Sequence, residues 1–204
     1  MVRSTARLLS IAIFCLLPAN ADAGNTAFDC LGVFKRGASH ISLVTAFGAS
    51  NIGREDVFMY GDTMPMTIVF PKDPQRRLAV QWHDDKKRSG LDRVIIRRPA
   101  NWSVGGVGIG MSLADVERLN GRPFKLQDFE GDAGGLVTDW MGGKLATLPG
   151  GCRLGAGFGI NLVALSTAQW NADSEGTVSS DDAALRAAEP KLGELTVYFP
   201  DNSK

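Results

Sequence analysis

The sequence predicts an α+β fold in which an antiparallel sheet carries helices packed on one face. The first observation is the strict alternation of apolar and polar residues at 77–82, which is typical of a half-buried strand. The second is the helical spacing of apolar residues in 40–47 and 112–119. Further short β-rich segments are separated by glycine and proline turns. Several antiparallel strands accompanied by a few helices are the pattern of an α+β domain.

Residues 1–23 are expected to be an export signal and not part of the fold. Arg3 and Arg7 give a positive start, and the apolar run Leu8–Leu17 that follows is too short to span a bilayer comfortably. Ala21-Asp22-Ala23 is then a cleavage signal of the A-x-A type. We therefore expect the rest of the chain to be periplasmic or secreted. It contains no further apolar stretch long enough for a transmembrane anchor.

Cys30 and Cys152 are the two cysteines that follow the export signal. In an oxidising compartment the expected state of such a pair is a disulfide, and the chain-entropy model gives roughly 4–5 kcal/mol of stabilisation for so long a loop. Two unpaired, buried thiols are the alternative. A redox function is not expected, because the sequence contains no C-x-x-C.

The main body of the predicted domain covers 24–165 and holds two related units, at about 39–100 and 108–165. In the first unit, the helix 40–47 is expected to stop at Gly48. The strands expected after this helix are 56–60, 66–70, 77–82 and 93–98, with turns at 61–65 and 71–74.

The second unit repeats this order of elements. Ser112 and Asp115 form a capping-box pattern at the start of the helix 112–119, and Gly121 is expected to stop it. The strands expected after this helix are 135–140 and 152–158. The succession of helix, glycine, strands and a tryptophan at a strand end occurs twice, which predicts a tandem repeat of a helix-plus-hairpin unit.

Residues 166–204 are expected to complete the same domain as a polar loop, a short helix and a closing strand. Ser179 with Asp182 is a capping pattern before the helix 183–188. The closing strand 194–199 alternates apolar and polar residues, and we expect it at a sheet edge.

The start of the second helix resembles a known superfamily. Ile109-Gly110-Met111-Ser112, followed by Asp115-Val116, Leu119 and Gly121, is similar to the helix-start motif of the β-lactamase-inhibitory-protein-like fold, which includes the small lipoprotein subunit of the outer-membrane barrel-assembly machine. Residues 110–145 also resemble a group of uncharacterised exported bacterial proteins. The resemblance covers about a fifth of the chain. It implies helices on antiparallel strands and a binding role, and it carries over no inhibitory residue.

A basic stretch is the strongest candidate for a binding surface. Residues 72–98 contain nine basic and four acidic side chains. A solvated hairpin rim is the alternative interpretation, and nucleic acid is not an expected partner because no aromatic residues are interleaved with the bases. The candidate binding residues, for a protein or an anionic envelope component, are Lys86, Lys87, Arg88, Arg97 and Trp102.

The four tryptophans divide into two classes. Trp82 and Trp140 lie on the apolar faces of predicted strands, so we expect them in the core. Trp102 and Trp170 lie in less periodic segments, where either could be an exposed anchor for a partner.

No metal or cofactor site is expected. The glycine-rich segment 105–110 precedes a helix, but no Lys-Ser/Thr follows it, which excludes a P-loop. Glycines in this position more often make turns. His40 and His83 each lack a second ligand at metal-binding spacing.

Acidic residues within 128–139 leave one enzymatic alternative open. Paired carboxylates are what a hydrolase of cell-wall or extracellular polymers would use. The residues in question are Asp128, Glu130, Asp132 and Asp139. The function that the sequence favours is an exported, non-catalytic binding or interaction protein of the bacterial cell envelope.

Overall fold

The computed structural model describes residues 26–59, 61–130, 133–161, 163 and 169–200, so the expected export signal at 1–23 lies outside the described residues. The described strands are β1 (Thr26–Phe28), β2 (Ile52–Met59), β3 (Asp62–Val69), β4 (Leu78–Asp84), β5 (Ser89–Arg97), β6 (Trp102–Val104), β7 (Val107–Gly108), β8 (Lys125–Gln127), β9 (Val137–Asp139), β10 (Arg153–Gly159), β11 (Thr177–Ser179) and β12 (Lys191–Tyr198). The described helices are α1 (His40–Phe47), α2 (Leu113–Asn120) and α4 (Ala183–Ala187), with 3-10 turns η1 (Ala49–Asn51) and η2 (Pro149–Gly151).

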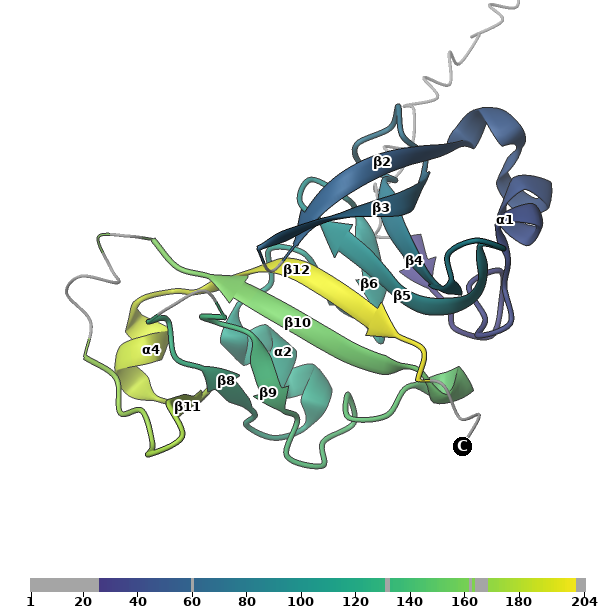
Figure 1. Ribbon diagram of the computed structural model, residues 1–204. Helices are drawn as coiled ribbons and strands as arrows, with labels where there is room; N and C mark the ends of the chain where they lie inside the picture. The colour runs from purple at the N-terminus through teal and green to yellow at the C-terminus, as the bar shows by residue number, and fades with distance from the viewer. Residues whose placement is uncertain (1–25, 60, 131–132, 162, 164–168, 201–204) are drawn as a thin grey trace, which may run out of the picture.

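Antiparallel pairing dominates the fold (Figure 1). A six-stranded sheet has the order β10-β12-β5-β4-β3-β2, and the two three-stranded sheets have the orders β11-β8-β9 and β1-β6-β7. Among these pairs, β1 and β6 run parallel. Antiparallel sheets with a few short helices fit the predicted α+β class.

The last strand, β12, lies inside the six-stranded sheet and not at its edge, so the edge position expected for 194–199 is wrong. Val197 pairs with Leu154 of β10 on one side and with Val94 of β5 on the other. Val197 is fully buried, and Thr196, on the opposite face of the strand, is only 4% exposed. The alternation of apolar and polar residues correctly predicted that one face of the strand is buried. It did not predict burial of the opposite face, because that face carries the polar residue Thr196.

The helix signals at α1 and α2 are confirmed, whereas the Ser179–Asp182 capping box expected before α4 is wrong. Ser112 Oγ accepts from the Asp115 amide while the Asp115 carboxylate accepts from the Ser112 amide, and Gly121 ends α2 in the left-handed conformation with φ of 82°. An equivalent box formed by Ser39 and Ser42 starts α1. The cap of α4 is Asp182 alone, whose carboxylate accepts from the Leu185 amide at 2.9 Å.

The turn expected at 61–65 is wrong, because β3 already begins at Asp62. β2 and β3 pair along eight residues each, whereas β3 pairs with β4 only through Thr67–Val69. Pro65 explains where that second ladder stops, since proline has no amide hydrogen to donate to β4. The outer part of the β2–β3 hairpin, 55–66, therefore extends beyond β4. We call it the hairpin arm.

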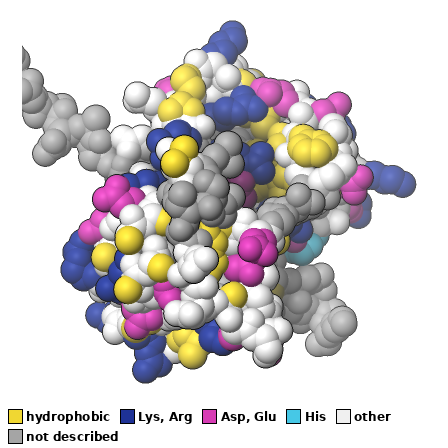
Figure 2. All heavy atoms as spheres, turned by 90° about the vertical axis from the view of Figure 1, so that its left-hand side faces the viewer, with side chains coloured by type: hydrophobic (Ala, Val, Ile, Leu, Met, Phe, Trp, Pro, Cys, Tyr) yellow, Lys and Arg dark blue, Asp and Glu magenta, His cyan; other side chains and the backbone are white. Residues whose placement is uncertain are grey.

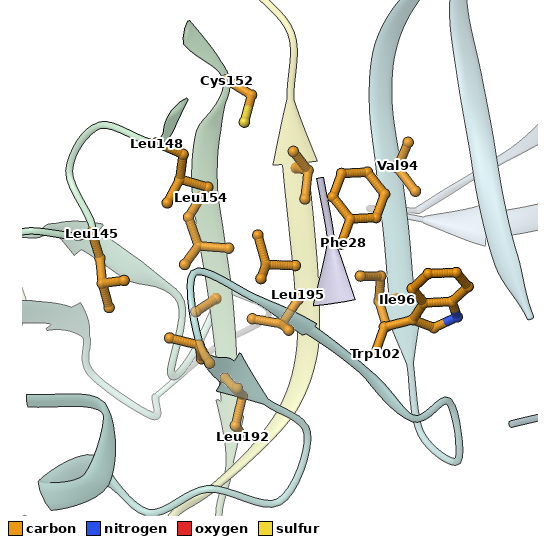
Figure 3. Close-up of a cluster of buried hydrophobic side chains, with 14 of the residues drawn as sticks. Phe28, Val94, Ile96, Trp102, Leu145, Leu148, Cys152, Leu154, Leu192 and Leu195 are labelled. Carbon is orange, nitrogen blue, oxygen red and sulfur yellow. The ribbon is translucent and has the colours of Figure 1, made fainter. Parts of the chain in front are cut away.

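The larger of two core clusters joins residues from both halves of the chain. Leu43 of α1, Val116 of α2 and Leu185 of α4 belong to the same buried cluster as the strands of the large sheet, part of which is drawn in Figure 3. Trp82 and Trp140 are buried as expected, with 4% and 7% of their surface exposed. Their indole N–H groups donate to Thr67 Oγ1 at 2.9 Å and to the Leu154 carbonyl at 2.8 Å. Both buried indoles therefore have a hydrogen-bond acceptor for the N–H group as well as apolar packing partners.

Cys30 and Cys152 form the expected disulfide, with an S–S distance of 1.99 Å across a sequence separation of 122 residues. Both cysteines are buried. The bond joins the segment after β1 to the residue that precedes β10, and so links the start of the described chain to its C-terminal half.

Asn120 is a buried polar residue that no sequence pattern identified. Its amide nitrogen donates to the carbonyls of Arg122 and Trp140 at 2.9 and 3.0 Å, and its amide oxygen accepts from the Leu145 amide at 3.1 Å. The residue is 1% exposed. Asn120 therefore fixes the 140–145 turn against the end of α2.

Removal of the disulfide should lower the free energy of unfolding by about 4–5 kcal/mol, because the open chain regains loop entropy in the unfolded state. The test is urea denaturation of the C30A/C152A variant beside the wild type, each with and without reductant. Reductant should destabilise the wild type and leave the variant unchanged. Equal stability of oxidised and reduced wild type would contradict the expectation.

Asn120→Ala should lower the free energy of unfolding by about 2–4 kcal/mol, since it removes the hydrogen bonds of Asn120 to the Arg122 carbonyl and the Leu145 amide and one of the two accepted by the Trp140 carbonyl. Gln75→Ala is the matched control, because Gln75 is exposed. It should change stability by less than about 0.5 kcal/mol. Similar denaturation midpoints for the two variants would show that the Asn120 network is not stabilising.

Candidate functional site

The structure does not bring the candidate basic residues into one patch. Lys86, Lys87 and Arg88 lie in the turn between β4 and β5, whereas Arg97 is the last residue of β5. β5 has nine residues. At about 3.3 Å per residue, Arg97 therefore lies roughly 25–30 Å from Arg88. The basic residues that are close together in the sequence are therefore distributed along β5 and the turn before it, and they do not form one patch.

Local acids also neutralise much of this positive charge. Lys87 Nζ lies 3.4 Å from Asp84 Oδ2, and Arg97 Nε lies 2.6 Å from Glu194 Oε2. On the face drawn in Figure 2, basic and acidic side chains are interspersed. These residues therefore do not form a broad surface of one charge sign, which would attract an anionic partner through its electrostatic field.

Trp102 is buried, so the expectation that it could be an exposed anchor is wrong. It is 6% exposed and makes edge contacts with Phe28 and Phe34, at centroid distances of 6.4 and 6.3 Å. Its indole N–H donates to the Arg76 carbonyl at 3.0 Å. Figure 3 shows it beside Ile96. The periodicity signal was weak because β6 is only three residues long. Trp170 is half-buried.

Two of the described acidic residues of 128–139 cap local turns. Asp128 Oδ1 accepts from the Glu130 amide at 3.1 Å, and Asp139 Oδ1 accepts from the Met141 amide at 2.7 Å. Glu130 and Asp139 are exposed, and Asp132 lies outside the described residues. Aspartate is frequent in such turns because its carboxylate bonds the backbone two residues on.

A groove across strands β10 and β12 is the most prominent hollow in the described surface that we identified. It consists of two cavities of about 500 and 860 Å³ that share Leu136, Gly157 and Glu194 as lining residues. His83 and Tyr198 lie at one end of this β10–β12 groove, and Phe58 and Arg98 lie at the other. Phe58, on the hairpin arm, is 67% exposed. Phe58 therefore gives the groove an accessible aromatic wall.

Alternating glycines in β10 explain why the hollow exists. Gly155, Gly157 and Gly159 occupy every second position of the strand, so no β10 side chains rise from this part of the floor. A Cβ atom at Gly155 would lie 2.8 Å from the Tyr198 ring, and one at Gly157 would lie 3.2 Å from Leu136. A Cβ atom at Gly159 would meet nothing within 4 Å. The groove is thus open above Gly159.

Polar side chains along the groove are mostly paired with one another. Glu194 accepts from Arg97 at 2.6 Å and from Thr196 Oγ1 at 3.2 Å. His83 Nε2 lies 3.0 Å from the Phe199 carbonyl, and its Nδ1 lies 3.9 Å from Asp92 Oδ1. These pairs hold the walls in place, and they do not form a nucleophile with an adjacent base. The sequence did not indicate the groove, because the residues that line it come from distant segments of the chain.

Two further findings concern sites and spans. Gly105 and Gly106 make the turn between β6 and β7 with φ of 58° and 84°, so these glycines serve a turn, as expected. Within the described part of the chain, no cluster of three or more His, Cys, Asp or Glu side chains is arranged to hold a metal ion. Across the same residues, no helix is long and apolar enough to cross a membrane.

Comparison with known protein families, with curated proteins and with solved structures finds no significant match to this chain. The groove must therefore be interpreted from its own chemistry.

His40, at the start of α1, has a lowered pKa. Burial lowers its pKa, and the positive charge of Arg88 lowers it further. The backbone N–H of His40 donates to the Arg88 carbonyl at 2.8 Å, and its Nδ1 is buried without a hydrogen-bond partner. The basic turn is therefore tied to the start of α1, which is a structural role for Arg88.

Stability should fall as the pH drops through the ordinary histidine pKa of about 6.5, because the unfolded chain binds a proton there that folded His40 resists. His40→Gln removes this contribution. Between about pH 7.5 and 5.5, the wild type should lose more unfolding free energy than the variant, as measured by urea denaturation at each pH. Parallel curves for the two proteins would overturn the assignment.

Proposed function

We propose that this protein is an exported, non-catalytic binding protein of the bacterial cell envelope, and that it holds an extended segment of another protein in the β10–β12 groove. The observation that carries the proposal is the continuity of two cavities over a strand with glycine at every second position of its floor. Tyr198 and Leu136 lie over Gly155 and Gly157, whereas nothing lies within 4 Å of the Cβ position of Gly159, so another backbone can approach the floor closely at this end.

The walls of the groove favour a peptide with apolar and acidic side chains. Phe58 and Leu136 offer apolar surface, and Arg98 adds an exposed cation at the same end. Aromatic and arginine residues are the side chains most often found at the energetic centres of protein interfaces. The anionic partner expected from the sequence is thereby moved from the basic turn at 86–88 to the end of β5.

Pairing of the polar side chains supports binding over turnover. Glu194 and Asp92, the groove carboxylates, are each engaged by an arginine, at 2.6 and 3.0 Å. The hydrolase alternative would need the acids of 128–139 to converge on a cavity, whereas Asp128 and Asp139 cap local turns. If E130Q/D139N abolished turnover of a cell-wall glycan or peptide, the alternative would replace the present proposal.

Export, ancestry and duplication are parts of this proposal. The disulfide is typical of oxidising compartments and supports a periplasmic or secreted location. The equivalent capping boxes of α1 and α2 support the tandem repeat and the likeness to the β-lactamase-inhibitory-protein-like fold, with helices on one face of the sheet. The two tryptophans at strand ends do not occupy matching places in the fold. Trp82 lies in the six-stranded sheet, whereas Trp140 follows β9 of a smaller sheet.

The test is selection of peptides from a random library on the purified protein, followed by measurement of their affinity for variants. Gly159→Trp should weaken peptide binding by about tenfold or more, because its side chain would fill the open end of the groove. Gly37→Trp is the matched control, since Gly37 is exposed, its Cβ would also meet nothing within 4 Å, and it does not line the groove.

Charge reversal distinguishes the groove from the basic turn. The variant K86E/K87E/R88E should bind the selected peptides as the wild type does, with thermal melting to confirm that it is folded. Unchanged affinity in Gly159→Trp, or loss of affinity in the charge-reversed variant alone, would move the site away from the groove.

A further inference from the structure

Strand β2 is an edge of the six-stranded sheet. Arg54, Asp56 and Phe58 on this strand are exposed. Open edges with unpaired backbone groups are templates for another strand. The chemistry of this edge decides what can pair with it.

Geometry of the hairpin shows which residues of β2 face outward. The Phe70 amide donates to the Asn51 carbonyl at 2.7 Å, and the same register continues along β2 and β3. In an antiparallel ladder, every second residue directs its N–H and C=O to the same neighbour. Odd-numbered residues of β2 therefore bond to β3, and even-numbered residues present their backbone groups to the open side. Those residues are Ile52, Arg54, Asp56 and Phe58.

The outward residues follow a self-complementary order: apolar, basic, acidic, apolar. Reversal of the strand places each residue opposite a suitable partner from an identical strand. Within the described chain, neither Arg54 nor Asp56 takes part in an ion pair. An exposed fraction of 67% leaves Phe58 available as well.

We infer that β2 pairs antiparallel with β2 of a second copy of this chain, with a two-fold axis at Glu55. Arg54 of one copy then faces Asp56 of the other, and Ile52 faces Phe58, each pair occurring twice. All four pairs join residues whose backbone groups point outward, so about eight backbone hydrogen bonds can form. The sheets of the two copies become one continuous sheet.

Charge complementarity and the hydrogen-bond ladder favour this register over its neighbours. A register centred on Arg54 or on Asp56 places identical charges directly opposite each other, which is destabilising. An axis centred between two residues would place each even-numbered residue opposite an odd-numbered one, whose backbone groups already bond to β3. Hydrogen bonds between the two copies could then not form. Charged residues commonly protect sheet edges from pairing. Registers centred on Gly53 or Val57 keep the hydrogen-bond ladder but do not pair Arg54 with Asp56, so the register centred on Glu55 is the one that forms both ion pairs.

The central Glu55 pair does not oppose this register. Glu55 accepts two hydrogen bonds from Arg77 of its own chain, at 2.9 and 2.7 Å. This hydrogen bonding, with the charge of Arg77, lowers the pKa of Glu55. Each carboxylate at the axis is therefore already accompanied by a guanidinium on the same face of the sheet, so the two copies meet as neutral pairs.

Sedimentation velocity of the purified protein over a concentration series tests the inference. The wild type should show a reversible monomer–dimer equilibrium. R54D and D56R should each weaken dimerisation by about tenfold or more, because they create two like-charge pairs. An equimolar mixture of R54D and D56R should recover the dimer as a heterodimer, since acids of one chain then face arginines of the other. The double variant R54D/D56R should form a homodimer.

The outcomes are decisive because the substituted side chains are exposed and thermal melting reports whether each variant is folded. A wild type that stays monomeric at high micromolar concentration overturns the inference. So does a dimer that R54D and D56R leave intact, or a mixture that fails to associate.

Discussion

Strand β12 is the element on which the rest of the structure depends, because it pairs with β5 on one side and β10 on the other. The first of these strands comes from the N-terminal half of the chain and the second from the C-terminal half. Since β12 lies near the end of the described residues, the large sheet is incomplete until nearly all of them have been made. The disulfide acts in the same direction by linking the segment after β1 to the start of β10.

The open features of the molecule follow from this arrangement. Insertion of β12 leaves β10 at one edge of the sheet and β2 at the other. At the first edge, glycines remove side chains from the floor and leave the groove. At the second, Pro65 ends the ladder between β3 and β4 and frees the hairpin arm, whose Phe58 reaches the groove wall. Pro65, which has no amide hydrogen, thus shapes the β2 edge, and the three alternating glycines of β10 shape the groove.

Short-range features were predictable from the sequence. The bounds of α1, the capping box of α2, the glycine stop at Gly121 and the burial of Trp82 all match expectation, because each depends on residues within one or two turns or one strand. The groove was not predictable in the same way. It combines residues from the hairpin arm, β5, β10, β12 and the segment before β9, and no local pattern links those segments.

By itself the sequence determined which segments bury a face and where helices begin and end, since hydrogen-bond caps and side-chain periodicity are local. It also determined that Cys30 and Cys152 were the pair available for a disulfide after the expected export signal. Only the tertiary structure decided that β12 is internal, that the bases of 72–98 are dispersed, and that Trp102 is buried. Those outcomes depend on which strand lies beside which, and strand order is set by the shared core and not by any one segment.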